Sequence, residues 1–262
     1  MGLKMEKKEL SIILPVLNCL NYTKGFLRTI KTGRRYGLIL INNGSTDGTA
    51  DYFSHLGSRP DVFVKNSDKN PGIFVKNFDK NIGVAAAWNY GIKAAYRIFN
   101  SDYFFIANND ILLSPVAIDN LIAVFSNPSI VLSSGDDVSG RVAAPDDVLA
   151  VLGPSREKLK PHPDFSCFML GKKAIARIGF FDENFYPAYF EDNDYHYRIK
   201  LAGLRAVKTN RAPYFHFGSR TIRENAGIRE LSNAGYLANR DYYIKKWGGL
   251  PGKEKYKTPF GK

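Results

Sequence analysis

The chain has 262 residues, of which 44% are hydrophobic and 24% are charged. This length fits one large domain with a substantial core, or two closely joined halves. The longest apolar runs are strand-sized and exclude a membrane-spanning helix of roughly 20 residues. Cys19 and Cys167 have neither metal-type nor disulfide-framework spacing. Because the sequence shows no signal-peptide pattern, we expect a cytoplasmic protein, either free or peripheral at the inner membrane face.

Lysine and arginine outnumber the acidic residues by 37 to 25, which gives a formal net charge of +12. Such an excess favours an anionic partner, namely a nucleotide phosphate, an anionic membrane surface or a nucleic acid. The alternative is that the charge serves solubility alone. The basic stretch 245–262 has no RNA-binding signature, so nucleic acid is the less favoured partner.

The first half of the sequence alternates apolar strands with helical patterns. Strands are predicted at 10–16, 37–43 and 102–108, and helices at 22–31, 84–99 and 114–126. This alternation predicts a parallel sheet with crossover helices. Ligands of such folds bind at the carboxyl ends of the strands.

A short duplication interrupts this half, because FVKNSDKNPG at 63–72 recurs as FVKNFDKNIG at 74–83. The second copy runs directly into the helix at 84–99, so we expect it to be the functional copy. The first copy is expected to lie at the rim of the site.

In the second half, residues 134–163 are rich in Gly, Pro, Asp and Ser, which predicts a connecting loop. A strand at 165–170 and helices at 171–179, 191–203 and 229–249 are predicted to follow it. We therefore divide the chain into a donor half (1–133), an acceptor half (134–225) and a C-terminal helix with a basic tail (226–262). All three are expected to form one compact domain.

Polar residues follow three of the predicted strands at the points where they end. Asn18 follows the first strand, Asn42-Asn43-Gly44 ends the second, and Asn108-Asn109-Asp110 ends the third. Asp47 is a candidate cap for the next helix, and Asn81-Ile82-Gly83 forms the turn into the helix at 84–99. A helix N-terminus of this kind favours an anion. Well-capped loops with a purely structural role are the alternative.

The end of the third strand is a candidate metal site. Mg²⁺ and Mn²⁺ prefer oxygen ligands, often one or two carboxylates together with substrate phosphates. Asp110 offers a carboxylate, and Asn108 offers an amide oxygen two residues away. The alternative is a polar strand end with Asp110 facing water.

An acidic cluster, Glu191, Asp192 and Asp194, follows an aromatic run that includes Tyr189. Aromatic rings stack on the apolar faces of sugars, and a nearby carboxylate can deprotonate a hydroxyl. The alternative is that these acids only stabilise a helix N-terminus. Three roles are possible for His216 from the sequence: a metal ligand, a phosphate contact or a packed core residue.

Six ordered segments resemble the family-2 glycosyltransferases: SIILPVLN, INNGSTDGT, NIGVAAAWNYGI, FIANNDILLS, FEDNDYHYRIKLAG and HFGSRT. The resemblance covers residues 10–220 and implies the GT-A fold. This is an α/β fold with a mostly parallel, Rossmann-like central sheet flanked by helices and a smaller acceptor-side region. It also implies inverting transfer of a sugar from a nucleoside-diphosphate-sugar to a hydroxyl acceptor, such as a glycan or glycolipid.

The resemblance further implies roles for individual residues. Asp192 would be the general base, while Glu191, Asp194 and Tyr189 would bind the acceptor or orient the base. Asp110, with His216, would hold Mn²⁺ or Mg²⁺. The nucleotide-sugar would contact a larger set: Pro15, Leu17, Asn18, Asn43, Asp47, Asn81, Gly83, Asn89, Asn108 and Asn109.

Two positions depart from the family pattern. Asn108 stands where the first aspartate of an Asp-x-Asp motif is usual, so Asp110 carries the metal prediction nearly alone. Asn42 and Asn43 stand where many members have aspartates, which leaves the choice among uracil, thymine and guanine open. The asparagines are reminiscent of rhamnosyltransferase-like members that use dTDP-sugars, and UDP or dTDP is the favoured donor nucleotide. One alternative is a polyanionic acceptor, such as modified DNA or a lipid diphosphate. A nucleotidyltransferase and a non-catalytic basic module that binds nucleic acid or membranes are the others, although PVLNCLNYTKG lacks the Gly-rich loop of a nucleotidyltransferase.

Overall fold

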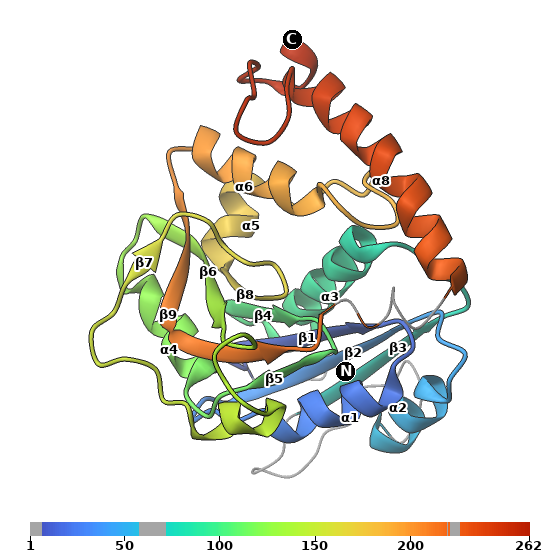
Figure 1. Ribbon diagram of the computed structural model, residues 1–262, viewed down its shortest axis with the longest axis vertical. Helices are drawn as coiled ribbons and strands as arrows, with labels where there is room; N and C mark the ends of the chain where they lie inside the picture. Colours follow the sequence, from blue (N-terminus) through green and yellow to red (C-terminus); the bar gives the residue numbers. More distant parts are fainter. Residues whose placement is uncertain (1–6, 58–71, 219, 221–225) are drawn as a thin grey trace, which may run out of the picture.

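One β-sheet with helices on both faces forms the centre of the molecule (Figure 1). The computed structural model describes residues 7–57, 72–218, 220 and 226–262. Its strands are β1 (Leu10–Val16), β2 (Tyr36–Asn43), β3 (Gly72–Phe78), β4 (Tyr103–Ala107), β5 (Ile111–Leu113), β6 (Ile130–Asp137), β7 (Leu159–Lys160), β8 (Cys167–Gly171) and β9 (Arg205–His216). Its α-helices are α1 (Leu20–Thr29), α2 (Thr49–Gly57), α3 (Val84–Phe99), α4 (Ala117–Ala123), α5 (Lys172–Ile178), α6 (Glu191–Leu201) and α8 (Ala226–Trp247). Short 3₁₀ helices are η1 (Val124–Ser126), η2 (Pro145–Ala150) and η3 (Pro259–Gly261).

The sheet is mixed, with a parallel core. Its strand order is β3-β2-β1-β4-β8-β6-β9-β5, and β7 pairs with β9 outside this path. The neighbouring strands from β3 to β4 run parallel. Beyond them β8 is antiparallel to both β4 and β6, and only β6 and β9 form a further parallel pair among the described strands. The predicted α/β fold is therefore confirmed, and its parallel part is concentrated in the first half of the chain.

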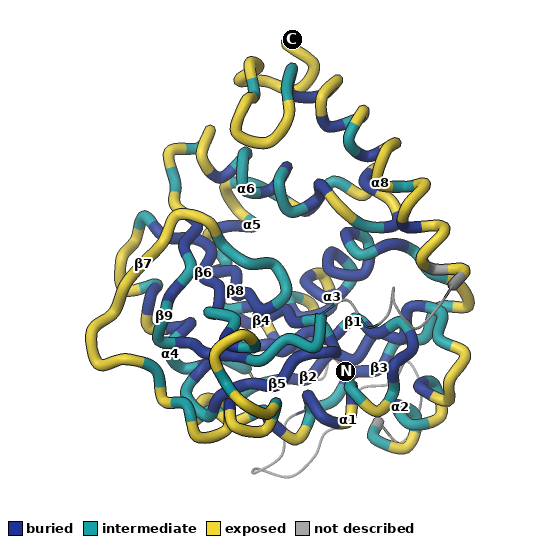
Figure 2. Tube along the Cα trace, viewed as in Figure 1, coloured by how far each residue is buried: buried dark blue, intermediate teal, exposed yellow. Residues whose placement is uncertain are grey.

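Alternate residues of the central strands enter two hydrophobic cores, one on each face of the sheet. Ile13 packs on the face covered by α3, α5 and α6, whereas Ile12 packs on the face covered by α1, α2 and α4. Ile12 is paired with Leu38 of β2 and Phe105 of β4, and both belong to the same core as Ile12. Because both faces are buried (Figure 2), these strands are continuous apolar runs in the sequence.

Helix α3 packs closely on β1. A Cβ atom at Gly91 would lie 2.3 Å from Cγ2 of Ile13, so a larger residue would push the helix away from the strand. Ala87 and Ala95 are fully buried on the same helix. Small side chains thus hold the N-terminus of α3 at the edge of the sheet where the parallel strands end.

The segment after residue 133 is more ordered than a connecting loop. Strand β6 crosses the expected boundary at 133/134 and continues to Asp137, and η2 and β7 lie within 134–163. The first copy of the duplication, 63–72, lies outside the described residues except for Gly72, whereas the second copy forms β3 and the turn into α3. Within the described ranges, no helix combines the length and apolarity needed to cross a bilayer.

Candidate active site

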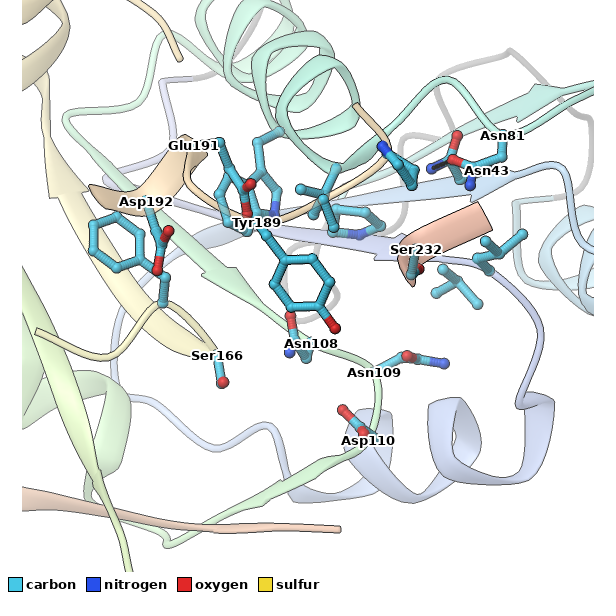
Figure 3. A pocket seen from close by; sticks show the side chains of 18 of the residues that line it. Asn43, Asn81, Asn108, Asn109, Asp110, Ser166, Tyr189, Glu191, Asp192 and Ser232 are labelled. Atoms are coloured by element: carbon cyan, nitrogen blue, oxygen red, sulfur yellow. Dashed lines mark hydrogen bonds between the residues drawn. The ribbon is translucent and has the colours of Figure 1, made fainter. Parts of the chain in front are cut away.

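A cavity of about 360 Å³ opens where the parallel strands end (Figure 3). Because β1, β2 and β4 run parallel and in register, the residues that follow them meet at this edge. The cavity is lined by eleven of the predicted site residues: Pro15, Leu17, Asn43, Asn81, Asn108, Asn109, Asp110, Tyr189, Glu191, Asp192 and His216. The structure therefore brings residues from six separate segments of the chain to one cavity.

Asn43 and Asn81 shape the end of the cavity nearest β2 and β3. Nδ2 of Asn43 donates to Oδ1 of Asn81 at 3.0 Å, and Oδ1 of Asn43 accepts the backbone N–H of Ile82 at 2.9 Å. Oδ1 of Asn81 also accepts the N–H of Gly83 at 2.8 Å. Amide side chains satisfy both donors and acceptors here, which an aspartate at position 43 could not do. The asparagine-rich sequence thus fixes the turn into α3.

The loops after β1 and β2 are tied together behind the cavity. Oδ1 of Asn18 accepts the N–H of Thr46 at 2.8 Å. The carboxylate of Asp47 accepts the N–H of Leu20 at 2.8 Å and the hydroxyl of Thr49 at 2.6 Å. Asp47 therefore joins the first turns of α1 and α2. Neither Asn18 nor Asp47 is among the residues that line the cavity.

Asp110 and His216 form a buried pair at the far end of β4. Oδ1 of Asp110 lies 3.3 Å from Nε2 of His216, and Oδ2 accepts the backbone N–H of Arg220 at 3.0 Å. Burial opposes ionisation of Asp110, but His216 and the Arg220 N–H outweigh it and lower its pKa. Burial likewise opposes protonation of His216, but Asp110 outweighs it and raises the pKa of the imidazole. Nε2 of His216 has no hydrogen bond of good geometry to the described residues, although it is buried.

Glu191 and Asp192 begin α6 on the opposite side of the cavity (Figure 3). Burial, together with the neighbouring Asp192, raises the pKa of Glu191 well above its ordinary value. Burial also raises the pKa of Asp192, although the N–H of Asn193 donates to its Oδ1 at 2.8 Å. Oε2 of Glu191 is buried and has no hydrogen-bond partner among the described residues. An unpartnered buried carboxyl oxygen at a cavity is a group that a ligand can satisfy.

Tyr189 stands at the mouth of the cavity, and α8 supports the loop that carries it. Tyr189 and Phe190 both adopt the left-handed backbone conformation, with φ of 80° and 72°, which is strained for bulky residues. Nδ2 of Asn239 donates to the carbonyls of Ala188 and Tyr189 at 2.8 and 3.1 Å. The C-terminal helix therefore holds the strained turn that precedes Asp192.

The model of a family described as glycosyl transferase family 2 matches residues 11–168, more than half of the chain. The chain belongs to glycosyl transferase family 2. Over 85 residues it is 36% identical to a galactofuranosyl glycosyltransferase of Leishmania donovani, a match that covers 32% of this chain and 19% of the relative. It thus spans about a fifth of that relative's length.

Two solved glycosyltransferase structures are similar to this one. The mannosyltransferase PcManGT from Pyrobaculum calidifontis, in complex with GDP-Man and Mn²⁺, superposes with a TM-score of 0.58 at 15% identity, over 89% of this chain and 71% of its own. GalNAc-T7 with UDP, GalNAc and Mn²⁺ gives a TM-score of 0.64 at 11% identity, over 93% of this chain and 48% of its own. These similarities show that this family member has the GT-A fold.

Besides Asn18 and Asp47, three further predicted site residues do not line the cavity of this glycosyltransferase. Asn89 is buried in α3, where its amide exchanges hydrogen bonds with the backbone of Phe181 at 2.9 Å in both directions. Gly83 caps α3 with φ of 86°. Asp194 is fully buried behind the cavity and bonds to Arg198, Lys246 and Trp247. These contacts favour a structural role for Asn89 and Asp194.

Several residues that line the cavity of the transferase were not among the predicted site residues. Trp88 and Val84 reach the cavity from α3, Asp164 and Ser166 from the segment before β8, and Ser232 from α8. For Asp164, the sequence did offer an indication of a site, namely a polar residue directly before the strand predicted at 165–170. Ser232 has no such sign, because its place depends on how α8 packs against the body of the protein.

A buried ion network joins α8 to α6, and its lysine is expected to be important for stability. Nζ of Lys246 lies 2.6 Å from Oδ1 of Asp194 and 2.7 Å from Oδ2 of Asp182. We expect Lys246→Met to lower the free energy of unfolding by about 3 kcal/mol, because it leaves the half-buried Asp182 without a cation and the buried Asp194 with Arg198 alone. The neighbouring Lys245 is exposed, and Lys245→Met should stay within about 0.5 kcal/mol of wild type. Urea unfolding measures both, and equal stability of the two variants would contradict the assignment.

Proposed function

We propose that the protein transfers a sugar from a nucleoside-diphosphate-sugar to a hydroxyl acceptor with inversion at the anomeric carbon. One observation carries this proposal. The buried pair Asp110–His216 and the acid pair Glu191–Asp192 line the same cavity, which is also bordered by the turns at Asn43 and Asn81 (Figure 3). This arrangement supports a diphosphate site and a base for a hydroxyl around one space.

The donor would bind along the strand ends. Backbone and side chains at Pro15, Leu17 and Asn43 offer a pocket for the nucleoside, and Asn81 lies beside them. The diphosphate would then point toward Asn108 and Asp110. Solved relatives contain GDP-Man or UDP, and the asparagines after β2 lead us to favour UDP or dTDP here.

The residues present fit a divalent cation that arrives with the diphosphate. No group of three or more His, Cys, Asp or Glu side chains in the described part of the chain forms a ready-made cation site. Asp110 and the buried, hydrogen-bond-free Nε2 of His216 offer two ligands, and Asn108 offers an amide oxygen nearby. One or two protein ligands plus substrate phosphates is a common arrangement for Mg²⁺. When bound, such an ion neutralises the charge on the departing diphosphate.

Asp192 is proposed as the general base. Its carboxylate accepts the proton of the acceptor hydroxyl while the hydroxyl oxygen attacks the anomeric carbon and the bond to the diphosphate oxygen breaks. The N–H of Asn193 holds one carboxylate oxygen at 2.8 Å. Because burial raises the pKa of Asp192, its ionised form is a stronger base than an exposed aspartate.

A thermal-shift experiment tests the nucleotide site. A ligand at 100 times its Kd stabilises a protein by about 2.7 kcal/mol, so we expect UDP, dTDP or GDP to raise Tm by roughly 5–10 °C. Mn²⁺ should enlarge the shift, and EDTA should reduce it. AMP is the control ligand. The absence of a shift with all three diphosphates would contradict the proposal.

The pH dependence of kcat/KM should show the raised pKa of Asp192. The base must be ionised, so activity should fall as pH decreases through this pKa, at a higher pH than for an exposed aspartate of about 3.9. Asp164 is one of the charges that raise the pKa of Asp192. Asp164→Asn should therefore move the acidic limb of the profile to lower pH. A limb that does not move, or that moves to higher pH, would count against Asp192 as the titrating group.

A further inference from the structure

A second cavity, of about 380 Å³, adjoins the first at Asp192. Tyr189 and Asp192 line both cavities. The carboxylate proposed as the base therefore stands between a space for the donor and a separate, open space. A group that enters the second space reaches Asp192 from the side away from the nucleotide turns.

The walls of the second cavity are partly aromatic and come from residues 189–193 and from the C-terminal segment. Tyr236 of α8 packs edge-on against Tyr189, with ring centroids 5.5 Å apart, and lies 5.3 Å from the ring of Phe190. Tyr189 and Tyr236 remain 38% and 45% exposed, so their rings are available to a ligand. Leu250 and Pro251, beyond α8, close the cavity on another side.

The charge of the second cavity excludes a polyanion. Asp192 is the only charged side chain among the described residues that line it, and Asn193 and the hydroxyls of Tyr189 and Tyr236 supply the other polar side-chain groups. Phosphates are bound by arginine, lysine or clustered backbone N–H groups, and a carboxylate at this position would repel them. A long alkyl chain fits poorly too, because it would cover Asp192 and Asn193 without offering hydrogen bonds.

We propose that the second cavity binds the acceptor as a neutral sugar ring of a glycan. The apolar face of the sugar ring stacks on Tyr236, and the edge of the sugar contacts Tyr189, which lies nearly perpendicular to Tyr236. One ring hydroxyl reaches Asp192, which removes its proton. Tyr236 and Leu250 then determine acceptor specificity, although both lie outside the 11–168 segment that the family model matches. This inference rests on the proposed transferase function, since it takes Asp192 as the base.

Saturation-transfer NMR on the full chain tests the inference, with methyl glycosides of glucose, galactose, mannose and rhamnose as probes and the tightest-binding nucleoside diphosphate present. At least one glycoside should receive saturation on its ring protons. Tyr236→Ala should weaken its binding by roughly 3- to 10-fold, the value of one aromatic contact. Leu237→Ala is the matched control, because Leu237 neighbours Tyr236 on α8 and is 53% exposed but does not line the cavity. This control should bind the glycoside as wild type does.

Dodecyl phosphate and a short oligothymidylate serve as competitors. The inference would be overturned if either competitor displaced the glycoside and if that same competitor no longer bound to the Tyr236→Ala variant. So would an absence of saturation on every glycoside, or equal effects of Tyr236→Ala and Leu237→Ala. Nucleoside diphosphate affinity, measured by calorimetry, separates this inference from the proposed function. If nucleotides bind and glycosides do not, the acceptor inference alone is wrong; if no nucleotide binds, the function is wrong.

Discussion

Asp192→Asn is expected to lower kcat for sugar transfer by about 10²–10⁴-fold, the contribution of a positioned general base. Asparagine keeps the size of the side chain and an oxygen that can accept the N–H of Asn193, but it cannot take a proton from the acceptor. The turns at Asn43 and Asn81, which we propose to border the nucleotide, make no hydrogen bond with Asp192. The Kd for the nucleoside diphosphate should therefore stay within a few-fold of wild type. Initial rates and calorimetry measure the two quantities.

Two further variants distinguish Asp192 from other acids. Glu191→Gln should cost less than Asp192→Asn, because Glu191 has the more strongly raised pKa and glutamine resembles a protonated carboxyl group. Asp241→Asn removes an exposed charge on α8 and should leave kcat unchanged. Transfer by Asp192→Asn at a near wild-type rate would refute the assignment of the base. A larger loss in Glu191→Gln would move that role to Glu191.

The side of the cavity proposed to bind the donor was predictable from sequence because its geometry follows from local patterns. β1, β2 and β4 are largely apolar runs, and each ends in asparagine or is followed by one within two residues. Parallel pairing of buried strands then brings Leu17, Asn43 and Asn108 to one edge. No long-range information beyond the strand order was needed for this part.

Asp194 shows where grouping by sequence proximity is insufficient. Two residues along an α-helix differ by about 200° in direction, so Asp192 and Asp194 point to opposite sides of α6. Asp192 faces the cavity, whereas Asp194 faces the buried network with Lys246 and Trp247. Helical periodicity is enough to separate the two acids, but the partners of Asp194 come from a helix about 50 residues further along the chain and depend on tertiary packing.

The contribution of α8 depends on tertiary packing that no local pattern encodes. Asn239 binds carbonyls about 50 positions earlier in the chain, and a Cβ at Gly235 would lie 2.4 Å from Cδ of Pro187. The sequence predicted a helix here but contained no reason to place it beside Tyr189. The sequence alone therefore did not indicate that Ser232 lines the first cavity or that Tyr236 lines the second.

Asp110→Asn is expected to lower kcat by about 10²–10³-fold, equivalent to the several kcal/mol that a cation supplies to a departing diphosphate. Asn108 is already neutral, so the variant would have no carboxylate at this strand end. The variant should also lose the additional rise in Tm that Mn²⁺ gives in the presence of a nucleoside diphosphate. This second readout does not require an acceptor.

The ion pair with His216 provides an internal check on the Asp110 variant. Asp110→Asn removes a buried ion pair, so its free energy of unfolding without metal must be measured separately from its activity. Asp51→Asn, an exposed acid on α2, is the control for the loss of one negative charge. His216→Ala should reduce the Mn²⁺ effect in the same direction, since Nε2 of His216 is buried and has no hydrogen-bond partner among the described residues. Full wild-type activity in EDTA would show that neither residue binds a metal needed for transfer. Asp110 would then have a structural role, in which it accepts a hydrogen bond from the N–H of Arg220 and pairs with His216.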